Sequence, residues 1–324
     1  MPDKETAIPA SAQPDPGEFD FDLNRTLSSI LAVRTEIPPD AFTAQILGTE
    51  RAGSGVLIDH NGLVLTIGYL ITEAETIWLT SSTGTAVPGH IVGYDQGTGL
   101  GLVQALGRLG VPALEFGSAT HLKASDPVII AGHGGRQQAL QAEVAGKREF
   151  AGYWEYLLDE AIFTAPAHPN WGGAACLDLD GRLCGIGSLF IQHERGDQEQ
   201  TNANMIVPID LLPPILDDLL KFGRVNRPAR PWLGMYTADT QHTPVVVGLA
   251  TGGPADGAGV HVGDVVLEVG GERVSDLATM LRRIWSLGPA GVEVPLTVVR
   301  EGRPTQVVVH SADRNSFLKQ PSLH

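Results

Sequence analysis

The chain has 324 residues, enough for two or three cores, and its 43% hydrophobic and 18% charged residues are ordinary for a globular protein. Its formal net charge of -15 excludes nucleic acid and anionic membrane surfaces as expected partners, because both are negatively charged. No apolar run approaches the roughly 20 residues of a membrane-spanning helix. The 39 glycines and 22 prolines indicate many turns and therefore a mainly β architecture.

The first segment, residues 1–24, is rich in Pro, Asp and Glu, and we expect it to be a disordered lead. It lacks a basic start followed by an apolar core, so it does not read as a secretory signal. We therefore predict a cytoplasmic location, or a periplasmic one if a signal has been removed. The next stretch, "RTLSSILAVR" (25–34), has nearly helical apolar spacing, with the start of a strand as the alternative.

From Gly53 onward the sequence consists of short apolar runs that are closed by turns, a pattern that predicts a Greek-key barrel or sandwich. Asn61-Gly62 is the strongest hairpin signal in the chain. Cys176 and Cys184 flank another hairpin turn, "LDLDGRL". A cross-strand disulfide is sterically conceivable there, whereas a cytoplasmic location favours two reduced, buried thiols.

The pattern changes period near residue 210. We predict a helix that Asp210 caps and Gly223 ends, followed by a basic, proline-bearing linker over 224–231. A smaller unit then begins, containing an amphipathic helix in "DLATMLRRIWSLG" and a final hairpin that turns at Glu301-Gly302. The tail, residues 313–324, looks loose.

Four stretches in this order carry a family resemblance: "GSGVLIDHNGLVLT" (53–66), "VGYDQGTGLGLVQAL" (92–106), "HPNWGGAACLDLDGRLCGI" (168–186) and "GPADGAGVHVGDVVLEVGGERV" (253–274). They resemble the HtrA/Deg family of trypsin-like serine proteases, in which a trypsin-like double β-barrel precedes a PDZ domain. The resemblance implies a mainly β fold with an α+β PDZ domain. It places the double barrel in residues 25–223 and the PDZ domain in residues 232–312.

The catalytic positions that the resemblance implies hold other residue types. Tyr69 stands where the family has its histidine, and a phenol with a pKa of about 10 is a poor general base at neutral pH. Gly99 stands in place of the aspartate and Trp171 in place of the serine, so neither an orienting carboxylate nor a nucleophile is present. Pro169 replaces the glycine whose N–H contacts the oxyanion. We therefore predict a degenerate triad with no catalytic residues and no enzymatic activity.

A rebuilt site is the rival interpretation. His133 falls in a loop that lines the cleft in the family, and His168 precedes the altered oxyanion segment. The two could meet, with Glu155 or Asp159 nearby, although histidines that are solvated or simply packed remain the plainer alternative. No histidine has metal-ligand spacing, so we predict neither a metal nor a cofactor. The aromatic stretch "EFAGYWEYLLDEAIF" (149–163) either covers the cleft, forms a protein-contact patch, or packs as one barrel strand and its loop.

The segment "RPWLGM" (230–235) resembles the carboxylate-binding loop of PDZ domains. The resemblance implies that backbone N–H groups hold a peptide C-terminus, that the peptide adds as a strand, and that its last side chain enters an apolar pocket. Arg227 or Arg230 could add charge near the carboxylate, or could be solvated linker charges. The predicted peptide-binding residues are Trp232, Leu233, Gly234, Met235, Met280, Leu281 and Ile284.

The sequence thus predicts an HtrA-like pseudoprotease that acts as a scaffold, adaptor or chaperone and binds protein or peptide C-termini through its PDZ domain. Two alternatives stay open: a serine-type or unconventional endopeptidase, and a small-molecule binding protein that uses the reshaped cleft. Because family members commonly assemble through the barrel domain, we expect a homotrimer to which residues 25–50 contribute.

Overall fold

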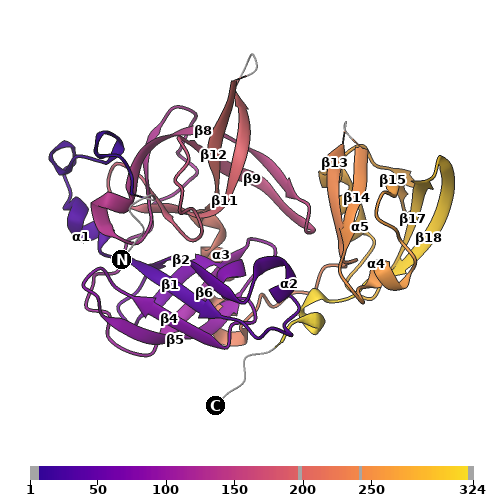
Figure 1. The fold of residues 1–324 in the computed structure, drawn as a ribbon, viewed down its shortest axis with the longest axis horizontal. Helices are drawn as coiled ribbons and strands as arrows, with labels where there is room; N and C mark the ends of the chain where they lie inside the picture. Colours follow the sequence, from indigo (N-terminus) through magenta and orange to yellow (C-terminus); the bar gives the residue numbers. More distant parts are fainter. Residues whose placement is uncertain (1–6, 196–198, 241–242, 320–324) are drawn as a thin grey trace. The chain divides into compact units, whose positions relative to one another are not determined.

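A computed structural model describes residues 7–195, 199–240 and 243–319 of the chain, which divide into two compact units. The first unit comprises the residues up to Arg148, Glu160–Val225 and Lys319. The second comprises Asn226–Leu318 together with Glu149–Asp159, an excursion from the first part of the chain. Figure 1 shows the first unit in indigo to salmon and most of the second in orange to yellow.

The first unit holds two closed six-stranded barrels, as the sequence predicts. Their strands carry fully buried aliphatic side chains such as Leu65, Leu102 and Ile130. The first barrel has the strand order β1-β2-β3-β6-β5-β4, formed by β1 Ile30–Glu36, β2 Glu50–Leu57, β3 Leu63–Ile67, β4 Thr76–Thr80, β5 Ala86–Tyr94 and β6 Leu100–Ala105.

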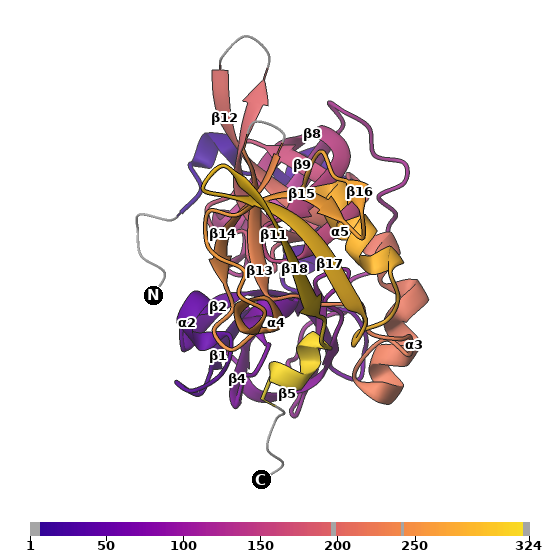
Figure 2. The same cartoon turned by 90° about the vertical axis from the view of Figure 1, so that its right-hand side faces the viewer.

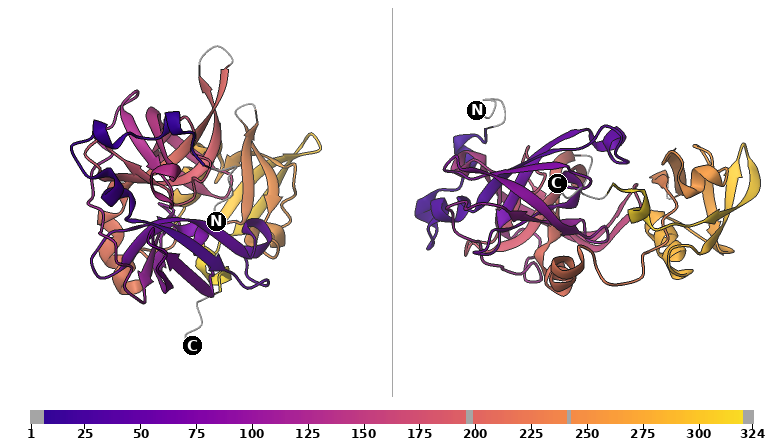
Figure 3. Two further views of the ribbon diagram at one scale, coloured as in Figure 1. Left: turned by 60° about the vertical axis from the view of Figure 1, so that its left-hand side comes forward. Right: turned by 90° about the horizontal axis from the view of Figure 1, so that it is seen from below.

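The second barrel repeats this design with the order β10-β11-β12-β9-β8-β7. The paired strands β11 and β12 run beyond the barrel wall and stand clear of it (Figure 3). Its strands are β7 Pro127–Ala131, β8 Ala139–Gly152, β9 Tyr156–Ala165, β10 Ala175–Leu177, β11 Leu183–Arg195 and β12 Glu199–Pro208.

The N-terminal segment differs from the expected disordered lead. Its described part carries two short 3-10 turns, η2 Ala10–Ala12 and η3 Pro16–Glu18, and the start of helix α1 Leu23–Leu27. Ile8 is buried and its N–H donates to the carbonyl of Gln137 over 3.1 Å. The apolar side chains scattered among the Pro and Asp residues therefore order the segment against the second barrel. Residues 1–6 lie outside the described part.

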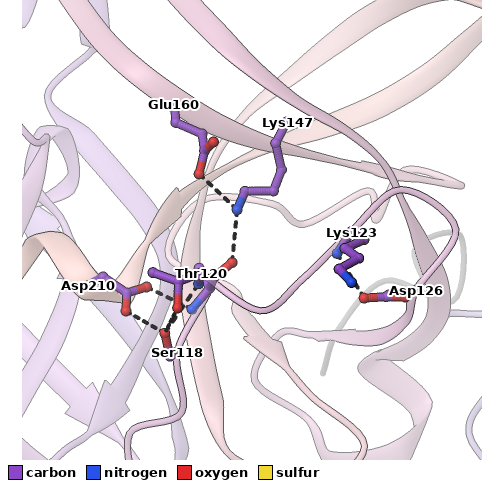
Figure 4. Close-up of polar contacts among 8 residues, drawn as sticks. Ser118, Thr120, Lys123, Asp126, Lys147, Glu160 and Asp210 are labelled. Atoms are coloured by element: carbon purple, nitrogen blue, oxygen red, sulfur yellow. Dashed lines mark hydrogen bonds and ion pairs between the residues drawn. The ribbon is translucent and has the colours of Figure 1, made fainter.

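The helix that closes the first unit, α3 Pro213–Phe222, ends at Gly223 in the left-handed conformation (φ 69°), as predicted. Asp210 is not its cap. The Asp210 carboxylate instead accepts from the hydroxyl of Ser118 (2.6 Å) and the N–H of Ala119 (2.7 Å), as Figure 4 shows. Lys147 donates to the Ala119 carbonyl and pairs with Glu160. This network joins the last turn before the helix to the loop that enters the second barrel.

The second unit has a sheet ordered β13-β14-β15-β17-β18, with β16 paired to β15 and helix α5 beside it (Figure 2). Helix α5 Leu277–Ser286 begins at Asp276, whose carboxylate accepts from the N–H of Thr279. The final hairpin turns at Glu301 (φ 50°) and Gly302 (φ 76°), as predicted. The strands are β13 Met235–Thr240, β14 Thr243–Leu249, β15 Val265–Val269, β16 Glu272–Arg273, β17 Glu293–Arg300 and β18 Arg303–His310, with short helix α4 Pro254–Gly257.

Three smaller observations complete the fold. Cys176 and Cys184 are free thiols, and burial raises the pKa of the Cys184 thiol to about 12. Part of the expected loose tail is ordered, since 3-10 turn η7 Arg314–Phe317 packs the ring of Phe317 4.9 Å from that of Trp232. No helix in the described ranges is long and apolar enough to cross a membrane.

Candidate functional site

The first candidate site is the meeting place of the two barrels, where the sequence puts the triad positions. Tyr69 lies in a 3-10 turn, η4 Gly68–Leu70, and its hydroxyl donates to the carbonyl of Ser188 over 2.9 Å. Its backbone carbonyl accepts from the buried guanidinium of Arg51 over 2.7 Å. Burial raises the pKa of the Tyr69 phenol far above its ordinary value, so the ring stays protonated at neutral pH.

The structure brings the other two triad positions beside Tyr69. The carbonyl of Gly99 (φ 80°) accepts from the N–H of Gly68 over 2.7 Å. A Cβ atom built on Gly172 would lie 2.9 Å from the Tyr69 hydroxyl, so the residue after Trp171 touches the phenol. Trp171 is half-buried and its ring lies 5.4 Å from that of Phe190. Tyr69, Gly99 and Trp171 thus lie in segments that contact one another, and their assignment to the triad positions stays a prediction.

The two candidate histidines lie near this group. A Cβ atom built on Gly132 would be 3.4 Å from both the Ser54 hydroxyl and Cε1 of His168, so these residues surround one small space. The N–H of His133 donates to the Ser54 hydroxyl over 3.1 Å. Nε2 of His133 is buried and has no hydrogen-bond partner within the described residues. Sequence reasoning missed Ser54, which lies in the "GSG" of the first hairpin.

His168 is held more completely than His133. Its Nδ1 accepts from the N–H of Asn170 over 3.0 Å, and its Nε2 lies 3.1 Å from the carbonyl of Gln138. Burial lowers the pKa of both imidazoles, so both are neutral bases at neutral pH. The expected neighbours Glu155 and Asp159 belong to the second unit, where Glu155 accepts from the N–H of Gly234 and Asp159 pairs with Arg282. Among the described residues, no group of three or more His, Cys, Asp and Glu side chains is placed to hold a metal ion.

The second candidate site is the carboxylate-binding loop of the second unit. The N–H groups of Leu233, Gly234 and Met235 all point at one carboxylate, that of Glu155, at 2.6–3.1 Å. Gly234 has a φ of 73°, a conformation that lets successive N–H groups converge. Five of the predicted peptide-binding residues are fully buried in the hydrophobic core of the unit, namely Leu233, Met235, Met280, Leu281 and Ile284, and the pocket for a ligand side chain stays a prediction.

Trp232, Arg230 and Arg314 lie around the carboxylate-binding loop or near it in the sequence. Trp232 is buried behind the loop, packed on Phe317, so it supports the loop from behind. Arg230 stacks its guanidinium 4.1 Å from the centre of the Trp285 ring, and its role in carboxylate binding stays a prediction. Burial raises the pKa of the Glu155 carboxyl to about 7, and the charge that opposes this rise comes from Arg314, in the segment expected to be loose. No local signal in the sequence marks Arg314 or Glu155 as part of this site.

Comparison with known proteins finds two matching domains. Residues 53–186 match the trypsin-like peptidase domain and residues 231–310 match the PDZ domain. The chain therefore has a trypsin-like peptidase domain followed by a PDZ domain.

Two curated relatives, from Chlamydia pneumoniae and Bartonella henselae, are named "Probable periplasmic serine endoprotease DegP-like". Each is 25% identical over 79% of this chain, which spans only 54% and 52% of their respective lengths, about half of each. Among solved structures, the HtrA-type protease AlgW with tripeptide has a TM-score of 0.53 at 20% identity, covering 95% of this chain and 99% of AlgW. The serine endoprotease from Yersinia pestis has a TM-score of 0.51 at 20% identity, covering 90% and 98%.

The curated relatives overturn the prediction that this chain is not an enzyme, because they are named serine endoproteases. The prediction inferred inactivity from the residue types at the family's catalytic positions, whereas peptide hydrolysis is defined by the geometry of the reacting groups and not by sequence position. The cytoplasmic location also lacks support, since the curated relatives are named periplasmic. Nothing among them supports the adaptor or chaperone roles.

Proposed function

We propose that this chain is an HtrA-type endopeptidase of the periplasm that recognises polypeptides by their carboxyl ends through its PDZ domain. The names of the relatives favour endopeptidase activity and a periplasmic location. The single observation that supports carboxyl-end recognition is the convergence of the N–H groups of Leu233, Gly234 and Met235 on one carboxylate. Backbone donors bind any C-terminal carboxylate, and the apolar pocket behind them selects the last side chain.

Hydrolysis of a peptide bond by this chain requires a nucleophile and a general base. Tyr69, Gly99 and Trp171 supply neither a nucleophile nor a base, so we assign hydrolysis to other side chains. The adjacent candidates are Ser54 and His133. The backbone N–H of His133 donates to the Ser54 hydroxyl, which puts the two residues next to each other. Burial lowers the pKa of the His133 imidazole, and its Nε2 is unpartnered among the described atoms. A neutral, unpartnered imidazole nitrogen is the atom that accepts a proton in general base catalysis.

The test is hydrolysis of casein by the purified full chain and by two variants. We expect His133→Ala and Ser54→Ala each to lower the rate at least about 100-fold, which is the usual contribution of general acid–base catalysis. His60→Ala is the matched control, because His60 is an exposed histidine on the same barrel as Ser54 and should leave the rate unchanged.

The outcomes separate the two parts of the proposal. If purified protein that binds peptides hydrolyses no casein, the endopeptidase part is wrong and peptide recognition remains. If casein is hydrolysed equally by wild type and by both variants, the assignment to Ser54 and His133 is wrong. Circular dichroism of each variant shows whether loss of activity reflects loss of the fold.

A further inference from the structure

The carboxylate-binding loop of the PDZ domain is already occupied, and the occupant is a side chain of the same chain. Strands β8 and β9 leave the second barrel as a long hairpin whose tip, Glu149–Asp159, belongs to the second unit. At this tip the Glu155 carboxylate accepts from Leu233 at 3.1 Å, from Gly234 at 2.6 Å and from Met235 at 3.0 Å. Glu155 is itself buried, so these N–H groups are its principal solvation.

The hairpin tip also supplies the other two features of a bound peptide end. The carbonyl of Tyr153, two residues before the carboxylate, accepts from the N–H of Thr237 on β13 over 2.9 Å, as an added strand does. Leu157 is buried in the apolar cluster that contains Met235 and Leu281, where the last side chain of a ligand is expected. Carboxylate, main-chain bond and apolar anchor are therefore all provided internally.

Ion pairs hold the tip in this arrangement, and the contacts of Glu155 offset a strained backbone. Arg282 of α5 pairs with both arms of the hairpin, with Glu149 and with Asp159, at 2.5 Å each. Glu155 itself has a φ of 62°, at the end of a tight turn where glycine is preferred. A glutamate at such a position carries backbone strain, and the loop contacts of its carboxylate offset that strain.

We propose that Glu155 is a built-in ligand of the PDZ domain, so that the hairpin tip and the carboxyl end of an external polypeptide compete for one site. The inference rests on the proposed recognition of carboxyl ends by that site. An external peptide that binds to the carboxylate-binding loop would displace the hairpin tip. The tip belongs to the same hairpin as β8 and β9, which are strands of the second barrel, so the displaced segment is attached to the peptidase domain. The ligand class is a free C-terminal carboxylate with an apolar last residue.

The test uses the full chain and a probe that mimics the competitor: fluorescein-labelled decapeptides of random sequence ending in leucine with a free carboxylate. Glu155→Gly removes the carboxylate and suits the positive φ, and Glu155→Gln is a second variant of unchanged size. We expect both to bind the probe at least about 10-fold more tightly than wild type, because a site occupied for most of the time loses apparent affinity in proportion. Glu160→Gln, which removes only an exposed partner of Lys147 on the same hairpin, should bind as wild type does.

A second readout is made without peptide. Amide hydrogen exchange over Leu233–Thr237 should be slow in wild type and in Glu160→Gln, and faster in both Glu155 variants. Unchanged exchange together with unchanged affinity would overturn the inference. Faster exchange with no binding of the probe by any form would instead overturn the proposed recognition of carboxyl ends, while leaving Glu155 as an internal ligand. The amidated form of the peptide pool should bind to none of the proteins.

Discussion

At the scale of single residues, Glu155 shows how the site balances burial against hydrogen bonding. Desolvation raises the pKa of its carboxyl to about 7 from an ordinary value of 4.5, and the N–H groups of Leu233, Met235 and Gly234 together with the charge of Arg314 oppose that rise. The other titratable groups around this cluster are Tyr236 and Tyr153. The hydrogen bonds thus favour the charged carboxylate, whereas its burial away from water favours the neutral acid.

The raised pKa predicts how docking of the hairpin tip depends on pH. An acid whose docked pKa exceeds its free value stabilises the docked form fully below about pH 4.5, and that stabilisation is lost as pH rises through about 7. The difference is on the order of 3 kcal/mol across that interval. NMR shifts of the Gly234 and Met235 amides should titrate with a midpoint near 7 in wild type and stay flat in Glu155→Gln. A midpoint near 4.5 in wild type would contradict the prediction.

At the scale of elements, the turn η4 and the segment around Trp171 show how a local fold persists with altered residue types. Glu73 accepts from the N–H groups of Phe42 and Thr43 and from the Thr43 hydroxyl, and Arg51 donates to Thr43 and to the carbonyl of Tyr69. These buried bonds hold η4 without any contribution from the side chain at position 69. The position of η4 therefore has support besides the bond from the Tyr69 hydroxyl to Ser188.

We predict that restoring the family's residue types at four positions gives a nucleophilic serine. The variant Tyr69→His, Gly99→Asp, Trp171→Ser with Pro169→Gly should be labelled by a fluorophosphonate at position 171, because it places a nucleophile, a base, its carboxylate partner and an N–H donor together. The strain of an aspartate at the positive φ of Gly99 should keep labelling slow. Mass spectrometry locates the label, and the same variant with alanine at position 171 is the control. A folded variant without label at 171 would show that these positions do not form the triad geometry.

At the scale of the whole molecule, the segment 25–50 carries apolar side chains that the unit does not bury. Helix α2 Ala44–Leu47 leaves Ile46 52% and Leu47 39% exposed. Adjacent exposed aliphatic side chains are typical of surfaces that contact another protein. This observation agrees with the sequence-based prediction that residues 25–50 contribute to a homotrimer, which stays a prediction.

Light scattering of the purified chain tests that prediction. We expect a mass of about three times the 34.3 kDa of one chain, since trimeric assembly is what the resemblance implies. Ile46→Glu should reduce the mass to that of one chain, because it buries a charge in an apolar contact. Leu106→Glu, at a residue that is 63% exposed elsewhere on the same barrel, should not change it. A single-chain mass for wild type would refute the trimer.

Local signals predict much of the fold. The turn at Glu301-Gly302 and the helix end at Gly223 each depend on residues within a few positions, so both can be predicted directly from the sequence. The prediction for Asp210 is wrong because its carboxylate is satisfied by Ser118, 92 residues away in sequence, and not by its own helix. The prediction for the N-terminal segment is wrong for the same reason, since Ile8 is ordered by a bond to the distant Gln137.

The sequence by itself determined the order and type of the domains, the residues at positions 69, 99 and 171, and the loop whose N–H groups bind a carboxylate. Only the tertiary structure decided what that loop holds. Glu155 is 78 residues from Leu233, in a stretch whose aromatic pattern is equally compatible with barrel packing. Backbone N–H groups donate to any carboxylate that lies within reach. Which carboxylate they bind therefore depends on where the tip of the β8–β9 hairpin lies, and no local sequence pattern encodes that position.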